Sequence, residues 1–214
     1  MAKIKIIEIF DSIEGEGSLV GYPVSFIRLE GCNLRCSWCD TKYSYDTENY
    51  KLMDINEILK VIKFFKNKKV CLTGGEPLYN EGFDLLFKTL LEEGYFVIIE
   101  TNGTLFRNII SVLYKRYNKN IHIVCSPKPF NNFYINDKLL PYIKELKFVV
   151  DNLLKIEDIL KFKDIHLNDI PIILQPEDNK KEMFKKSRDL QKKLLEKNIE
   201  VRIIPQYHKI FEVK

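Results

Sequence analysis

The chain has 214 residues, a length that one α/β domain commonly fills. Hydrophobic residues make up 45% and charged residues 30% of it, so the chain can bury a sizeable core, which excludes a disordered protein. The formal net charge is only +4 without a dense basic block, so nothing favours a nucleic-acid partner. No apolar run approaches the roughly 20 residues of a membrane helix, and the N-terminus lacks a signal peptide's apolar stretch, so we expect a cytoplasmic protein with no membrane partner.

Short apolar segments bounded by polar residues, Gly or Pro recur along the chain and predict strands. Residues 3–10 form an additional N-terminal strand, and the other segments are typical of buried parallel strands: 24–29, 70–73, 95–101, 121–125, 146–150, 171–175 and 200–204. Amphipathic helices are predicted after the capping pattern of Asp54 and Glu57, over residues 81–93, and over residues 180–197. This alternation predicts an α/β fold of βαβ units, either a full or partial barrel or a doubly wound sheet. No linker or repeat divides the chain, so residues 1–214 are expected to form one domain.

Polar segments follow five of the predicted strands at the point where each strand stops. They are the cysteine-containing loop after residue 29 and the segments 73–77, 100–103, 126–128 and 175–178. Because the carboxyl ends of parallel strands build the ligand site of such folds, we expect these segments to converge at one rim. Simple turn chemistry explains any one Gly or Pro taken alone, but five coincidences favour a site.

Five cysteines, an odd number in a chain expected to be cytoplasmic, do not predict a disulfide framework. Cys71 and Cys125 stand alone in apolar segments and are expected to be small buried side chains. In contrast, Cys32, Cys36 and Cys39 fall within eight residues, and their thiolates suit zinc or an iron–sulfur cluster. All three histidines are distant in sequence, so the fourth ligand of a structural zinc site is missing. A cluster with one iron left open is the favoured interpretation.

The CxxxCxxC loop of Cys32, Cys36 and Cys39, followed by Thr-Gly-Gly-Glu-Pro at 73–77, resembles the radical S-adenosylmethionine (SAM) superfamily. That resemblance implies a [4Fe-4S] cluster, bound SAM, and a modified incomplete (β/α) barrel with parallel strands and outer helices. It narrows to the 7-carboxy-7-deazaguanine synthase family and extends to about residue 209. The residues that carry this narrower match are 8–17, Gly21, Phe26, Arg28, 31–34, 39–41, 100–103, 126–128, Gln175, Pro176 and Asp178.

Members of this family convert 6-carboxy-5,6,7,8-tetrahydropterin to 7-carboxy-7-deazaguanine and ammonia, on the pathways to the 7-deazapurines queuosine and archaeosine. The resemblance therefore implies a lyase that uses the cluster, SAM and Mg²⁺, accepts electrons from a flavodoxin- or ferredoxin-type reductant, and forms a homodimer. The cluster and SAM carry the chemistry, so no side chain is assigned as catalytic.

The resemblance also implies a role for individual residues. Cys32, Cys36 and Cys39 hold the cluster, and Thr41 holds Mg²⁺, although the residues alone favour Asp40 as the magnesium ligand. The cofactor contacts are Gly75, Glu76, Glu100, Ser126, Pro127 and Lys128. The substrate contacts are Ile13, Glu14, Gly15, Arg28, Thr73, Gln175, Pro176, Glu177 and Asp178. Backbone contacts are expected at Glu14 and Glu177, and the role of residues 207–209 is left open.

Two alternatives remain open from the sequence. A glycyl-radical-enzyme activating enzyme is also small and carries CxxxCxxC, but it needs a protein partner and no pterin site. The Glu-Gly-Glu-Gly run at 14–17 and the segment Cys39-Asp40-Thr41 favour the synthase. A non-catalytic zinc-binding module is the alternative of another class, and it lacks the fourth ligand.

Overall fold

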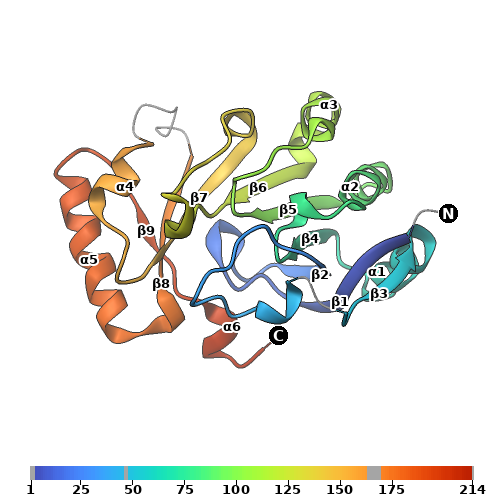
Figure 1. Cartoon of the computed structure of the whole chain (residues 1–214), viewed down its shortest axis with the longest axis horizontal. Coiled ribbons are helices and arrows are strands. Elements are labelled where there is room, and N and C mark those ends of the chain that lie inside the picture. The colour runs from blue at the N-terminus through green and yellow to red at the C-terminus, as the bar shows by residue number, and fades with distance from the viewer. Residues whose placement is uncertain (1–2, 46–47, 163–169, 214) are drawn as a thin grey trace.

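The computed structural model describes residues 3–45, 48–162 and 170–213, and its main feature is one curved sheet (Figure 1). The strand order is β3-β1-β2-β4-β5-β6-β7-β8-β9. Three strands form an antiparallel part, in which β1 (Lys3–Ile13) pairs with β2 (Pro23–Leu29) and with β3 (Lys51–Asp54). From β2 onward the pairing is parallel, through β4 (Lys69–Gly74), β5 (Phe96–Thr101), β6 (Ile121–Cys125), β7 (Ile143–Val150), β8 (Ile172–Pro176) and β9 (Arg202–Ile203). Among the described strands β3 and β9 are edges, so the barrel is incomplete, as predicted.

Helices cover the outer face of this sheet (Figure 1). They are α1 (Ile55–Phe65), α2 (Phe83–Glu92), α3 (Asn108–Tyr117), α4 (Ile156–Leu160) and α5 (Lys181–Leu195). The short α6 (Tyr207–Ile210) belongs instead to the C-terminal segment that contacts the loop after β1. The predicted capping box at the start of α1 is confirmed. Asp54 Oδ1 accepts the N–H groups of Asn56 and Glu57, and Glu57 Oε2 accepts the N–H of Asp54 at 2.7 Å.

Two apolar layers form the core, because side chains alternate between the two faces of each strand. The larger layer lies between the sheet and the helices and includes Leu72, Ile99 and Phe148. Inside the barrel the smaller layer consists of Val24, Cys71, Ile98 and Val124. Cys71 and Cys125 are both fully buried, which confirms their predicted structural role. Farther along the same inner faces, toward the carboxyl ends of the strands, the side chains become polar, and there the cavity opens.

The elements differ from the sequence expectation where local patterns are weak. β3 was not predicted, because it is a short edge strand with exposed Lys51 and Leu52. β1 extends three residues beyond its predicted end, and the predicted strand 200–204 is reduced to two residues. α3 was missed because few of its residues are buried, and between β6 and β7 the described chain forms 3₁₀ turns at Pro129–Asn131 and Leu140–Tyr142.

The C-terminal segment crosses the open side of the barrel and contacts the loop after β1. The Tyr207 N–H donates to Gly15 O at 2.9 Å, and Gln206 Nε2 donates to Glu16 Oε1 at 2.9 Å. A segment from the far end of the chain therefore completes the wall of the cavity. Within the described residues, no helix has both the length and the apolar character needed to cross a membrane.

Candidate active site

A cavity of about 480 Å³ lies at the carboxyl ends of the parallel strands. It brings together most of the residues that the sequence predicted for the site: Ile13, Glu14, Gly15, Arg28, Cys32, Cys36, Cys39, Thr41, Thr73, Gly75, Glu100, Ser126, Lys128, Gln175, Glu177 and Asp178. Glu76, Pro127 and Pro176 are next to these residues in sequence but do not line the cavity. The convergence expected from five strand ends is thus present, and each assigned contact remains a prediction.

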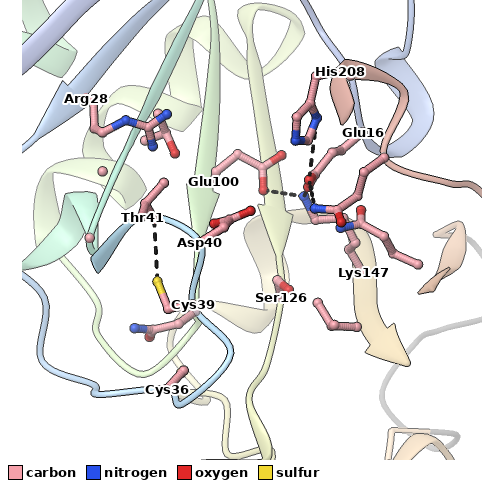
Figure 2. Close-up of a pocket in the computed structure, with 18 of the residues that line it drawn as sticks. Glu16, Arg28, Cys36, Cys39, Asp40, Thr41, Glu100, Ser126, Lys147 and His208 are labelled. Carbon is pink, nitrogen blue, oxygen red and sulfur yellow. Dashed lines mark hydrogen bonds and ion pairs between the residues drawn. The ribbon is translucent and has the colours of Figure 1, made fainter. Parts of the chain in front are cut away.

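The cysteine loop forms one side of the cavity, with Cys36 and Cys39 facing inward (Figure 2). Cys32 and Cys36 are buried, and Cys39 is half-buried. Burial raises the pKa of the Cys32 thiol to about 11, while the Leu34 N–H, 3.4 Å from Sγ, favours the thiolate. A metal that binds here therefore displaces protons. Three soft sulfur donors on one cavity wall fit an iron–sulfur cluster whose fourth iron faces the cavity.

The Thr-Gly-Gly-Glu-Pro segment packs directly on the cysteine loop. The Glu76 N–H donates to Gly31 O at 2.8 Å. A side chain at Gly75 would overlap Gly31 O, and its Cβ would lie 2.6 Å from the Cys32 Cβ. The absence of a side chain at Gly75 is what lets the two loops touch.

We expect Gly75→Ala to lower the cluster content and to reduce SAM cleavage by at least about tenfold, because the added methyl group must push the cysteine loop away. Iron and sulfide analysis after anaerobic reconstitution measures the first effect. Gly94→Ala is the matched control for cluster loading, since no atom lies within 4 Å of its built Cβ, although its φ of +83° is strained. Normal loading of Gly75→Ala would show that the close approach is not needed.

Glu76 is fully buried behind the cavity wall and is hydrogen-bonded within the protein. Its carboxylate accepts the Leu78 N–H at 3.0 Å, the Thr101 hydroxyl at 2.8 Å and the Asn102 N–H at 2.7 Å. Burial raises the pKa of Glu76 to about 7 against these hydrogen bonds, which lower it. The carboxylate thereby joins the ends of β4 and β5, and its predicted contact with SAM must share the carboxylate lone pairs that these hydrogen bonds use.

Opposite the cysteines lies a charged group of residues (Figure 2). Lys147, on the inner face of β7, is 3% exposed, and its Nζ donates to Glu16 Oε2 at 2.6 Å and to Glu100 Oε2 at 2.8 Å. Burial opposes the charge on Lys147, but the two carboxylates outweigh it and raise its pKa. Burial likewise opposes the charge of Glu16, but Lys147 holds the pKa of Glu16 down at about 2.

Sequence analysis missed Glu16 and Lys147 as site residues and left His208 open. His208 lines the cavity with its Nδ1 3.9 Å from Glu16 Oε1. A signal for Lys147 existed, because a lysine among Leu146, Phe148 and Val149 in a strand expected to be buried needs a charged partner. The Glu-Gly-Glu-Gly run at 14–17 marked the segment that contains Glu16, but nothing in it indicated the pairing with Lys147, and no pattern marked His208. These contacts depend on how β7 and the C-terminal segment lie in the barrel.

Arg28 and Thr41 are positioned by neighbouring side chains. Arg28 donates through Nε to Glu8 Oε1 at 2.8 Å, and its guanidinium lies 5.7 Å from the centre of the Tyr43 ring. Arg28 therefore forms an ion pair and also lines the cavity, and its contact with the substrate stays a prediction. The Thr41 hydroxyl lies 3.5 Å from Cys39 Sγ, and the exposed Asp40 carboxylate lies 3.5 Å from Lys209 Nζ.

Residues 26–143, more than half of the chain, match the family model described as the radical SAM superfamily. Together with the partial barrel and the three-cysteine loop, this match defines a radical SAM enzyme. Over 216 aligned residues the chain is 43% identical to 7-carboxy-7-deazaguanine synthase of Aquifex aeolicus, covering 99% of this chain and 94% of that protein. The chain belongs to the 7-carboxy-7-deazaguanine synthase family.

Further relatives and one solved structure agree with this assignment. The 7-carboxy-7-deazaguanine synthase of Thermoplasma acidophilum is 33% identical, with 96% of this chain and 95% of that protein covered. The crystal structure of QueE from Escherichia coli superposes with a TM-score of 0.74 at 25% identity, covering 96% of this chain and 95% of that one. The glycyl-radical activating enzyme and the zinc-binding module are not favoured. In the described part of the chain, no three His, Cys, Asp or Glu side chains are placed to hold a single metal ion.

Proposed function

We propose that the enzyme converts 6-carboxy-5,6,7,8-tetrahydropterin into 7-carboxy-7-deazaguanine with release of ammonia. The observation that carries this proposal is the cavity, in which Cys32, Cys36 and Cys39 line one wall and charged and polar side chains line another. Figure 2 labels Cys36 and Cys39 and, across the cavity from them, Glu16, Glu100 and Lys147. When bound, the cluster and SAM would supply a carbon radical that removes a hydrogen atom from C6 of the pterin. The protein's own task is then to orient the substrate beside SAM and to exclude water.

For the cofactors, the proposal assigns Cys32, Cys36 and Cys39 to the cluster. It assigns Gly75, Glu76, Glu100, Ser126, Pro127 and Lys128 to SAM. Lys128 supports the second assignment, because its Nζ donates to Ser126 Oγ at 2.7 Å at the edge of the cavity. Burial lowers the pKa of Lys128, so this ammonium group gains from a nearby anionic group such as the carboxylate of SAM.

For the substrate, the proposal assigns Ile13, Glu14, Gly15, Arg28, Thr73, Gln175, Pro176, Glu177 and Asp178. Gln175 supports the assignment of substrate contacts to this side of the cavity, because its buried Oε1 lacks a hydrogen-bond partner within the described residues. A polar ligand can satisfy that atom. Glu177 and Asp178 already pair with Lys180 and Lys209, at 2.8 Å and 2.9 Å, so their backbone groups are the expected contacts.

The proposal also includes a Mg²⁺ site, the partners of the enzyme and its location in the cell. Thr41 and the neighbouring Asp40 line the cavity and supply oxygen atoms of the kind Mg²⁺ prefers, while the ion keeps waters and takes oxygens from the substrate. We further propose one domain, a homodimer, a flavodoxin- or ferredoxin-type reductant and a cytoplasmic location, with a place in queuosine or archaeosine biosynthesis. The continuity of one sheet across the described residues supports the single domain.

Anaerobic turnover of the cluster-loaded enzyme with SAM, a reductant, Mg²⁺ and 6-carboxytetrahydropterin tests the proposal. Mass spectrometry should find 7-carboxy-7-deazaguanine and 5′-deoxyadenosine. A loaded enzyme that cleaves SAM without forming the deazaguanine would overturn the substrate assignment and leave the superfamily assignment intact.

We expect Arg28→Ala to lower kcat/KM for the pterin by about 100-fold, which corresponds to about 3 kcal/mol for a charge-assisted contact. The uncoupled cleavage of SAM should change much less, since Arg28 pairs with Glu8 away from the cysteines. Arg28→Lys keeps the charge without the planar fork and should be intermediate. Equal losses in pterin conversion and in SAM cleavage would place Arg28 elsewhere.

A further inference from the structure

Three carboxylates meet on one side of the cavity with one ammonium group among them. Glu14 and Glu16 come from the segment after β1, Glu100 comes from the end of β5, and Lys147 comes from β7. We call Glu14, Glu16 and Glu100 the carboxylate cluster. Lys147 donates hydrogen bonds to Glu16 and Glu100, at 2.6 Å and 2.8 Å. One positive charge thus serves two of the three acidic groups directly.

Glu14 is the most deeply buried member of the carboxylate cluster, with 4% of its surface exposed. Its Oε1 accepts the Glu16 N–H at the long distance of 3.3 Å. Glu14 is among the residues that line the cavity, and its buried Oε2 has no hydrogen-bond partner within the described residues. An ionised carboxylate in such surroundings is costly, whereas a neutral carboxylic acid is not.

Most of the charged groups around Glu14 also oppose its ionisation. Glu16 on its own loop and Glu100 on β5 are acidic, and Lys147 on β7 is the nearby cation. Cys71 on β4 faces it as a thiol, and His208 of the C-terminal segment contacts the adjacent Gly15. Burial first, and then the charges of Glu100 and Glu16, raise the pKa of Glu14 to about 8 against the opposing effect of Lys147.

We propose that Glu14 works as a neutral carboxylic acid whose O–H donates a hydrogen bond to an acceptor atom on the heterocyclic ring of the substrate. The inference rests on the proposed function, because it specifies how the site recognises a flat ring rich in hydrogen-bonding groups. A carboxylic acid presents one donor and one acceptor side by side, which matches a ring edge that carries an acceptor next to an N–H. Ionisation of Glu14 removes the donor and places a negative charge against the ring acceptor.

The pH dependence of Glu14→Gln tests this role, because the amide keeps a donor beside an acceptor and cannot ionise. For the wild type, kcat/KM for the pterin should fall about tenfold between about pH 7 and about pH 9 as Glu14 loses its proton. Glu14→Gln should match the wild type within about threefold near neutral pH and should lack this decline. Glu196→Gln, at the exposed position directly after α5, is the matched control and should keep the wild-type profile.

A third variant and a measurement without turnover complete the test. Glu14→Met keeps the size but removes the hydrogen bond, so KM for the pterin should rise at least about tenfold near neutral pH. This variant should not show the alkaline decline, and its uncoupled SAM cleavage should change little. Difference infrared spectra of the loaded wild type between neutral and alkaline pH should contain a C=O band of protonated Glu14, identified as the carboxylic acid band that disappears in Glu14→Gln while the band of Glu76 remains. This band reports the protonation of Glu14 whether or not the enzyme accepts a pterin.

The outcomes distinguish a failure of the proposed function from a failure of the role proposed for Glu14. If the wild type forms no deazaguanine but shows the infrared band, the proposed function fails while the neutral state of Glu14 stands. If deazaguanine forms and Glu14→Gln keeps the alkaline decline, or loses more than about tenfold near neutral pH, the donor role is overturned. Absence of the band in the wild type likewise overturns it, because Glu14 is then ionised.

Discussion

Cys36→Ala should abolish the reductive cleavage of SAM. Cys36 is buried on the cavity wall between the other two cysteines, and alanine removes one of three sulfur donors that hold the cluster. The loss should exceed the roughly 10- to 100-fold effect of removing an outer partner of a metal ligand, because a ligand itself is removed. Production of 5′-deoxyadenosine under anaerobic conditions, with and without pterin, measures the effect.

Cys125→Ala is the matched control for that experiment. Cys125 is also fully buried, but it faces the layer between sheet and helices, where its Sγ packs near Gly103. Alanine there should cost about 1 kcal/mol of stability and leave cluster content and SAM cleavage within about twofold of the wild type. Loss of cleavage in both variants, with normal folding, would contradict the assignment of the two cysteine classes.

Local patterns in the sequence predicted most of the fold and of the cofactor side of the site. The strand at 121–125 was found at its true bounds, and most of the others within a few residues, because buried parallel strands are rich in apolar residues. Cys32, Cys36 and Cys39 were recognisable because their chemistry depends on spacing within one loop. β3 and α3 were missed, since one is a short exposed edge and the other buries few side chains.

The charged side of the cavity depends on long-range contacts, which no local pattern encodes. Glu16 meets Lys147 across 131 positions and Gln206 across 190 positions of the chain. These contacts arise only when β7 and the C-terminal segment take their places in the barrel. The sequence therefore indicated which segments converge, while the pairing of individual charges required the structure.

Lys147→Met should destabilise the protein by about 3–5 kcal/mol near neutral pH. The substitution removes a buried cation and leaves Glu16 and Glu100 without the ammonium group that both of them contact. Lys147→Arg retains the charge and should lose less stability than Lys147→Met. Lys60→Met, at an exposed position of α1, should stay within about 0.5 kcal/mol of the stability of the wild type. Urea unfolding midpoints of the cluster-loaded proteins measure these differences.

The pH dependence of this loss has a definite sign. In the wild type, Lys147 holds the pKa of Glu16 at about 2, below the ordinary value of 4.5, so the stability from Glu16 is present above pH 4.5 and is lost only as the pH falls toward 2. Without Lys147, burial raises the pKa of Glu16 above that ordinary value and raises further the pKa of Glu100, which is already raised in the wild type. The folded variant gains stability as these groups take up protons, so the gap between wild type and Lys147→Met should narrow as the pH falls below neutral. A gap that stays constant, or widens on acidification, would show that lost packing rather than uncompensated charge causes the destabilisation.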